Sequence, residues 1–158
     1  MSLAYRRGLL DVMPTHPEIL GFGNDWYQPA FEAAMLVVLP SGRKIRMVSP
    51  PYFLATKLAA FDGRGQGDYM MSHDMEDIVA VLDGRPELVQ EVRDCDAGLR
   101  RHLQARFAAL LQDERFLEAL PGHMPSDEGN QARVPIIISR LETIARIGSD
   151  PKVGGPTH

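Results

Sequence analysis

The stretch from Ser49 to Phe61, Ser-Pro-Pro-Tyr-Phe-Leu-Ala-Thr-Lys-Leu-Ala-Ala-Phe, marks the point at which the hydrophobic pattern of this chain becomes helical. Leu54, Leu58 and Phe61 follow one another at i, i+4 and i+7, which is the spacing of one face of an α-helix. Ser49 is a favourable cap, and proline is common in a first helical turn. We therefore predict a helix from about residue 50 to Phe61.

Five further helices are predicted after residue 70. Ser72 can cap the first of them, and Gly84 can end it. Its body carries four apolar residues at the spacing of one helix face, namely Met75, Ile78, Val79 and Leu82. The other four are predicted over about 86–93, 97–111, 114–120 and 131–147. Pro135 lies in the first turns of the last segment, where it can kink the helix.

The part before residue 49 is richer in strand patterns. Short strands are predicted over 9–13, 35–39 and 44–48, and Pro40 to Arg43 forms a hairpin loop between the last two. Residues 21–27 read as a loop with aromatic anchors, and residues 32–34 as a short helical turn. No helix separates the second strand from the third, which argues against a doubly wound parallel fold.

The predicted fold class is therefore α+β, with a small, mostly antiparallel sheet packed on a helical C-terminal bundle. We divide the chain into a β-rich part over residues 1–48, a helical part over 49–148 and a flexible tail over 149–158. The length of 158 residues is enough for one domain with its own core.

Composition narrows the classes of function. The net charge of −4 argues against a surface built for non-specific nucleic-acid binding. The single Cys95 excludes an intramolecular disulfide framework and a cysteine-rich zinc site, and it fits a reducing cytoplasm. No apolar run is long enough to span a membrane, and the charged N-terminus is not followed by the apolar segment of a secretory signal.

The densest polar cluster lies between Lys57 and Asp77. Lys57 is placed beside the apolar stripe of its predicted helix, so it either extends to solvent or points into a cleft as a phosphate-binding cation. Asp74 and Asp77 are three residues apart on a predicted helix and therefore share a face. Asp74 also lies in the first turn, where a carboxylate favours the positive end of the helix.

These residues carry a resemblance to a known family. The segments 49–65 and 72–79 are similar to the second half of the AbiEii-type nucleotidyltransferases, many of which are toxins of bacterial toxin–antitoxin pairs. The family pattern is an apolar helix with Lys, Ala and Arg, followed by Lys or Arg, Asp, two residues and Asp with Leu or Ile. The matching residues here are Lys57, Ala60, Arg64, Asp74 and Asp77, and the resemblance covers roughly residues 6–85.

The resemblance implies a polymerase-β-like nucleotidyltransferase fold. By resemblance, Lys57 contacts the phosphates of an NTP and Asp74 is a further active-site residue. We therefore expect Lys57, Asp74 and Asp77 to be catalytic, and Lys57 and Arg64 to bind the nucleotide. Asp11 lies in a predicted strand, either at a sheet edge facing water or in a site. By resemblance it takes the place of a strand carboxylate that serves catalysis and binds magnesium.

Departures from the family pattern leave two expectations for the function of the protein. The family begins with Gly-Ser and Asp-x-Asp/Glu motifs, and the ten residues before Asp11 contain neither, while His73 replaces Lys or Arg. One expectation is therefore an enzyme that transfers a nucleoside monophosphate to an RNA or protein acceptor, with the missing motifs encoded upstream. The other is a relative, inactive as written, that binds a nucleotide, an RNA or a protein partner such as an antitoxin. A homo-oligomer could cover the exposed sheet edge.

Other readings of single residues remain open. His73-Asp74 is also the dipeptide of the HD phosphohydrolases, which bind metals, with His102 as a further candidate ligand. Cys95 is either a nucleophile or an ordinary thiol. The aromatic residues Phe22, Trp26 and Tyr27 either stack on a base or anchor a loop to the core.

Overall fold

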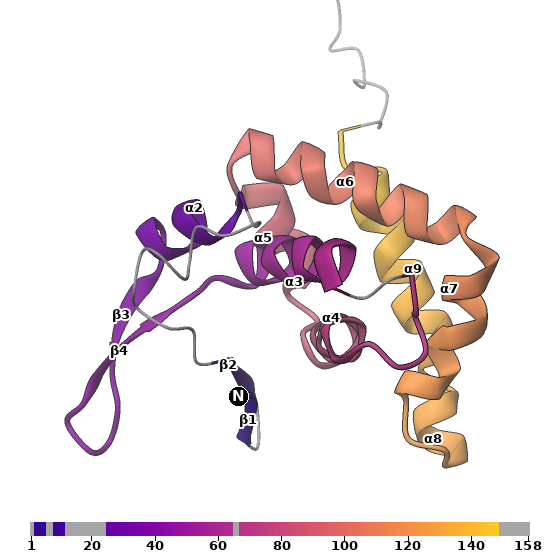
Figure 1. Ribbon diagram of the computed structural model, residues 1–158, viewed down its shortest axis with the longest axis horizontal. Coiled ribbons are helices and arrows are strands. Elements are labelled where there is room, and N and C mark those ends of the chain that lie inside the picture. Colours follow the sequence, from indigo (N-terminus) through magenta and orange to yellow (C-terminus); the bar gives the residue numbers. More distant parts are fainter. Residues whose placement is uncertain (1, 6–7, 12–24, 65–66, 149–158) are drawn as a thin grey trace, which may run out of the picture.

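The computed structural model describes residues 2–5, 8–11, 25–64 and 67–148, the first two of these ranges by their backbone alone. In the described part, two antiparallel hairpins and a set of packed helices confirm the α+β class (Figure 1). The expected flexible tail over 149–158 and the predicted loop residues 21–24 lie outside the described residues.

The two hairpins form separate two-stranded sheets, so the prediction of one small sheet is wrong for the described residues. The pair β1 (Ser2–Tyr5) and β2 (Gly8–Asp11) is antiparallel, with Ser2 opposite Asp11. The pair β3 (Met35–Val38) and β4 (Lys44–Met47) is antiparallel, with Met35 opposite Met47. The β3–β4 pair was predicted from the sequence, and β1 was not. Each strand is joined to its partner by a short local connection, so neither pair needs the other to form its ladder.

The β3–β4 hairpin projects away from the helices instead of packing on them (Figure 1). Most of its large apolar side chains are exposed, in contrast to the predicted sheet that packs on the bundle. Short α2 (Tyr27–Glu32) precedes this hairpin, so Tyr27 is helical and not part of a loop. By its backbone, β2 lies beside the helix that follows Ser72.

The helices agree closely with the predicted segments. They are α3 (Pro50–Arg64), α4 (His73–Gly84), α5 (Leu88–Asp94), α6 (Ala97–Gln112), α7 (Glu114–Ala119), the 3₁₀ turn η1 (Leu120–His123), α8 (Glu128–Gln131) and α9 (Val134–Ala145). The helix α3 runs one turn further than expected. The segment expected from Gln131 to Ile147 is divided, and α9 starts at Val134 with Pro135 in its first turn. Proline has no N–H to donate and is tolerated there, where no intrahelical acceptor is needed.

The core lies between the long helices. Figure 1 shows α6 running across the bundle with α9 crossing it, and these two helices form the most extensive helix pair. The helix α3 packs against α2, α4, α5 and α6, so it occupies the centre. The predicted apolar stripes of α3 and α4 are buried as expected, together with side chains from α6 and α9: Leu54, Leu58, Phe61, Ile78, Leu82, Leu103, Phe107, Ile137 and Leu141. In the described part of the chain, none of the helices is long and apolar enough to cross a membrane.

Candidate functional site

Lys57 lies in the middle of α3 with only 8% of its surface exposed, although its helix neighbours Leu54 and Leu58 are core residues. Its ammonium group is 2.7 Å from Oδ2 of Asp77 and 3.4 Å from Oδ1 of Asp74. The ring of Phe53 lies 5.5 Å from the same group. Of the two alternatives left by the sequence, extension to solvent is therefore wrong, because the amine is directed between two carboxylates of α4.

Arg64 is the last residue of α3 and binds Asp74 with a two-pronged contact. Its Nε donates to Oδ2 of Asp74 at 2.8 Å, and its Nη2 donates to Oδ1 at 2.7 Å. This is the geometry in which a guanidinium group matches a carboxylate or a phosphate. The Arg64 side chain is 68% exposed, whereas that of Asp74 is almost completely buried. Arg64 therefore closes the cluster on its solvent side.

The start of α4 places both acids on the face that meets α3. Ser72 caps the helix, because its Oγ accepts a hydrogen bond from the backbone N–H of Met75. Asp74 is in the first turn, and Asp77 follows one turn later on the same face. Because Ser72 caps the helix, Asp74 is not needed for this purpose. Its carboxylate binds Arg64 and Lys57.

The charges of this cluster, which consists of Lys57, Arg64, Asp74 and Asp77, balance one another. Burial alone raises the pKa of Asp74, but the hydrogen bonds and charge of Arg64 and then those of Lys57 outweigh burial. The pKa of Asp74 is therefore lowered from its ordinary value, and the carboxylate stays ionised at neutral pH. A buried carboxylate tolerates ionisation only when it is paired and hydrogen-bonded in this way.

Four of the five predicted site residues thus come together. The fifth, Asp11, ends β2, whose backbone lies beside α4, the helix that carries Asp74 and Asp77. Its side chain lies outside the described part of the structure. The contribution of Asp11 to the cluster remains a prediction.

Within the described ranges, no group of three His, Cys, Asp or Glu residues could hold a metal ion. The expected magnesium site at Asp11 is not tested by this finding, since that side chain is not among those described. For the HD-type alternative, His73 is exposed and pairs with Glu76 on its own helix. His102 instead packs against Trp26, with ring centroids 4.7 Å apart and the ring planes tilted by 38°.

The other described residues that were considered as functional candidates have structural surroundings. Burial raises the pKa of the Cys95 thiol, which donates to the carbonyl of Val92, so its nucleophilic thiolate is disfavoured. Trp26 packs against the core beside Tyr52, with ring centroids 6.4 Å apart, as expected of a loop anchor. Phe22 lies outside the described residues.

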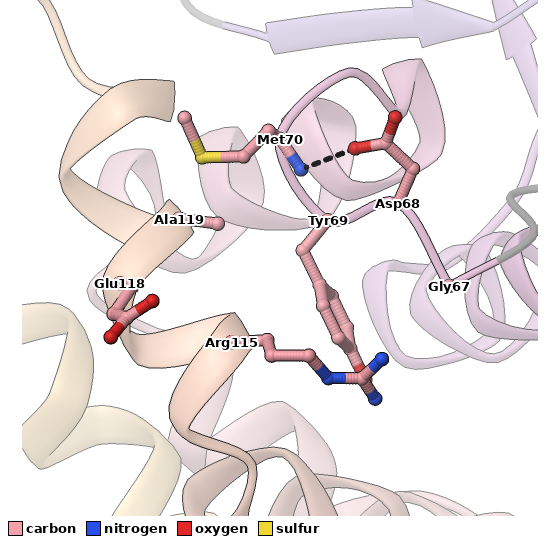
Figure 2. A pocket seen from close by; sticks show the side chains of 7 residues that line it. All are labelled: Gly67, Asp68, Tyr69, Met70, Arg115, Glu118 and Ala119. Carbon is pink, nitrogen blue, oxygen red and sulfur yellow. Dashed lines mark hydrogen bonds between the residues drawn. The ribbon is translucent and has the colours of Figure 1, made fainter.

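A second feature, a small open pocket of about 200 Å³, was not predicted from the sequence. Figure 2 shows Arg115 of α7 extending towards the ring of Tyr69, and Glu118 and Ala119 of the same helix also line the pocket. The guanidinium of Arg115 lies 5.5 Å from the centroid of the Tyr69 ring and is bound by Asp113. No spacing rule links Tyr69 to residues more than forty positions away, so the sequence held no local signal for this pocket.

A comparison of the chain with protein-family models, with curated proteins and with solved structures finds no match in any of the three.

Proposed function

We propose that this protein is nucleotidyltransferase-like and that its cluster binds the phosphates of an NTP. In the catalytic form of the proposal, a nucleoside monophosphate passes from the NTP to an RNA or protein acceptor. The observation that carries the proposal is the convergence of Lys57, Arg64, Asp74 and Asp77 in one network, since these are the residues that match the AbiEii-type pattern.

The chemistry of the two cations suits phosphate. Lys57 is a compact positive charge anchored by Asp77 at 2.7 Å, and Arg64 offers a planar fork of donors. Because Arg64 is largely exposed, its guanidinium can exchange the Asp74 carboxylate for a phosphate without unpacking α3. Asp74 would then be released to orient or deprotonate an attacking hydroxyl group. Asp11 is the proposed magnesium ligand.

The second candidate is a non-catalytic relative that binds a nucleotide or a protein partner such as an antitoxin. The balanced charges of the cluster favour this reading, because both acids are already neutralised by Lys57 and Arg64. In either form we propose that the protein acts in the cytoplasm, as its single cysteine suggests.

Calorimetric titration with each NTP, with and without magnesium, tests the proposal. We expect binding by the wild-type chain, a loss of about tenfold or more in affinity for Arg64→Gln, and no detectable binding for Lys57→Ala. The matched control is Arg133→Gln, because Arg133 makes a similar two-pronged contact with Asp83 at the opposite end of α4 and should leave affinity unchanged. Circular dichroism verifies the folding of each variant.

Failure of the wild-type chain to bind any NTP would contradict both forms of the proposal. If the Arg64→Gln and Lys57→Ala variants bind NTPs as tightly as the wild type does, the binding site lies outside the cluster. The two forms are separated by incubating the protein with NTPs labelled at the α-phosphate, together with RNA and with protein acceptors. Label on an acceptor supports the enzyme, and nucleotide binding without transfer supports the non-catalytic relative.

A further inference from the structure

The β3–β4 hairpin exposes more large apolar side chains than any other described element. Met35, Leu36 and Val38 of β3 are 72%, 61% and 62% exposed, and Met47 of β4 is 47% exposed. These side chains lie on both faces of the ribbon, because neighbouring residues of a strand point to opposite sides. An isolated two-stranded ribbon of this kind is marginally stable in water and normally gains further strands or a packing surface.

In the part of the chain that the structure describes, each strand of this hairpin has one edge without a neighbouring strand. One face of β4 contacts the rest of the protein, because the guanidinium of Arg46 lies 4.7 Å from the centroid of the Phe31 ring of α2. Among the described residues, β3 pairs with β4 alone, so its other edge carries backbone groups without a neighbouring strand. Open strand edges of this type accept strands from other chains.

The distribution of charge favours β3 over β4 as the edge at which two copies meet. Residues 33–42, which include all of β3, carry no charged side chain, whereas Arg43, Lys44 and Arg46 follow in the turn and in β4. Two copies of β3 placed side by side would bring only apolar residues together. Two copies of β4 would set Lys44 and Arg46 against the same cations, and like charges on facing strands are destabilising.

We infer that this protein self-associates through β3. The β3 strands of two copies pair antiparallel about a two-fold axis, which gives a four-stranded sheet in the order β4, β3, β3 of the second copy and β4 of the second copy. Such a symmetric contact is closed and stops at the dimer. Because each β3 is only four residues long, the contact is smaller than a standard interface, and the dimer is weak. This inference is independent of the proposed nucleotide site.

Sedimentation velocity over a wide range of protein concentration tests the inference. The wild-type chain should shift from monomer to dimer as concentration rises. Leu36→Lys should remain a monomer at every concentration, because it would place two cations at the paired edge. The matched control is Met47→Lys, which adds the same charge to an exposed apolar position of the outer strand and should still dimerise.

Cross-linking locates the contact. In a Cys95→Ser background, Leu36→Cys should form a disulfide-linked dimer under a mild oxidant, and Lys44→Cys should not. A wild-type chain that is monomeric at all concentrations would overturn the inference, as would a Leu36→Lys variant that dimerises normally. A monomeric chain that co-sediments with anionic lipid vesicles would also overturn it and would assign the hairpin to a lipid surface.

Discussion

Within the candidate site, the surroundings of Lys57 could be predicted from the sequence only in part. Its position next to Leu54 and Leu58 indicated an unusual lysine, but the spacing could not say whether its amine reached water or other charges. The structure directs the amine to Asp77 and Asp74, seventeen to twenty residues along the chain. Removing such charges from water is costly, so they are stable in this position because they are paired with each other.

The first prediction concerns Asp74. We expect Asp74→Asn to lower the free energy of unfolding at neutral pH by about 2–4 kcal/mol, because Arg64 and Lys57 lose a charged acceptor. The pKa of Asp74 is lowered in the folded state from an ordinary value of 3.8. The stabilisation is therefore complete above that ordinary value and disappears as the pH falls through the lower, folded-state pKa.

Urea unfolding over a series of pH values measures this effect. The difference between the wild type and Asp74→Asn should shrink as the solution becomes acidic. The control is Asp62→Asn on α3, whose carboxylate is exposed and paired with Arg106, and this substitution should change stability by less than about 1 kcal/mol. A difference for Asp74→Asn that stays constant with pH would contradict the ionic role of this residue.

Among the elements, α4 determines the geometry of the cluster. Its helical period places Asp74 and Asp77 on the face towards α3, and moving either acid by one position along the sequence would turn it away by about 100°. The sequence identified the start of α4 through Ser72 and the apolar stripe that follows. The start of α9 was not identified correctly, because the helical pattern between Gln131 and Pro135 did not show where the break falls.

The second prediction concerns the cap of α4. We expect Ser72→Ala to lower the free energy of unfolding by about 1 kcal/mol, because the N–H of Met75 loses its acceptor. Thermal or urea unfolding measures the change. Ser139→Ala is the matched control, since Ser139 is an exposed residue inside α9, where alanine is the better helix former. Equal destabilisation by both substitutions would contradict the capping role of Ser72.

At the scale of the whole molecule, the packing of α6 against α9 and α3 provides the buried apolar core. Phe107 of α6 is among its largest fully buried side chains. The third prediction is that Phe107→Ala lowers the free energy of unfolding by about 3–5 kcal/mol, because the lost contacts leave a cavity that neighbouring side chains fill only partly.

Chemical unfolding followed by far-ultraviolet circular dichroism measures this change. Ile136→Ala provides the control, because Ile136 is a large apolar residue of α9 that is exposed, and its loss should have a much smaller effect. A Phe107→Ala variant as stable as the Ile136→Ala variant would show that the core does not depend on the α6 packing.

The sequence by itself determined the helices from α3 to α7, their buried faces and the β3–β4 hairpin, because these depend on local spacing, caps and turns within a few residues. It also selected Lys57, Arg64, Asp74 and Asp77 as candidates. Only the tertiary structure decided that Lys57 is buried between two acids, that Arg64 closes the cluster from outside, and that the hairpins form separate sheets. These features depend on how α3 packs against α4 and on which strands meet, and contacts between distant parts of a chain leave no periodic pattern in its sequence.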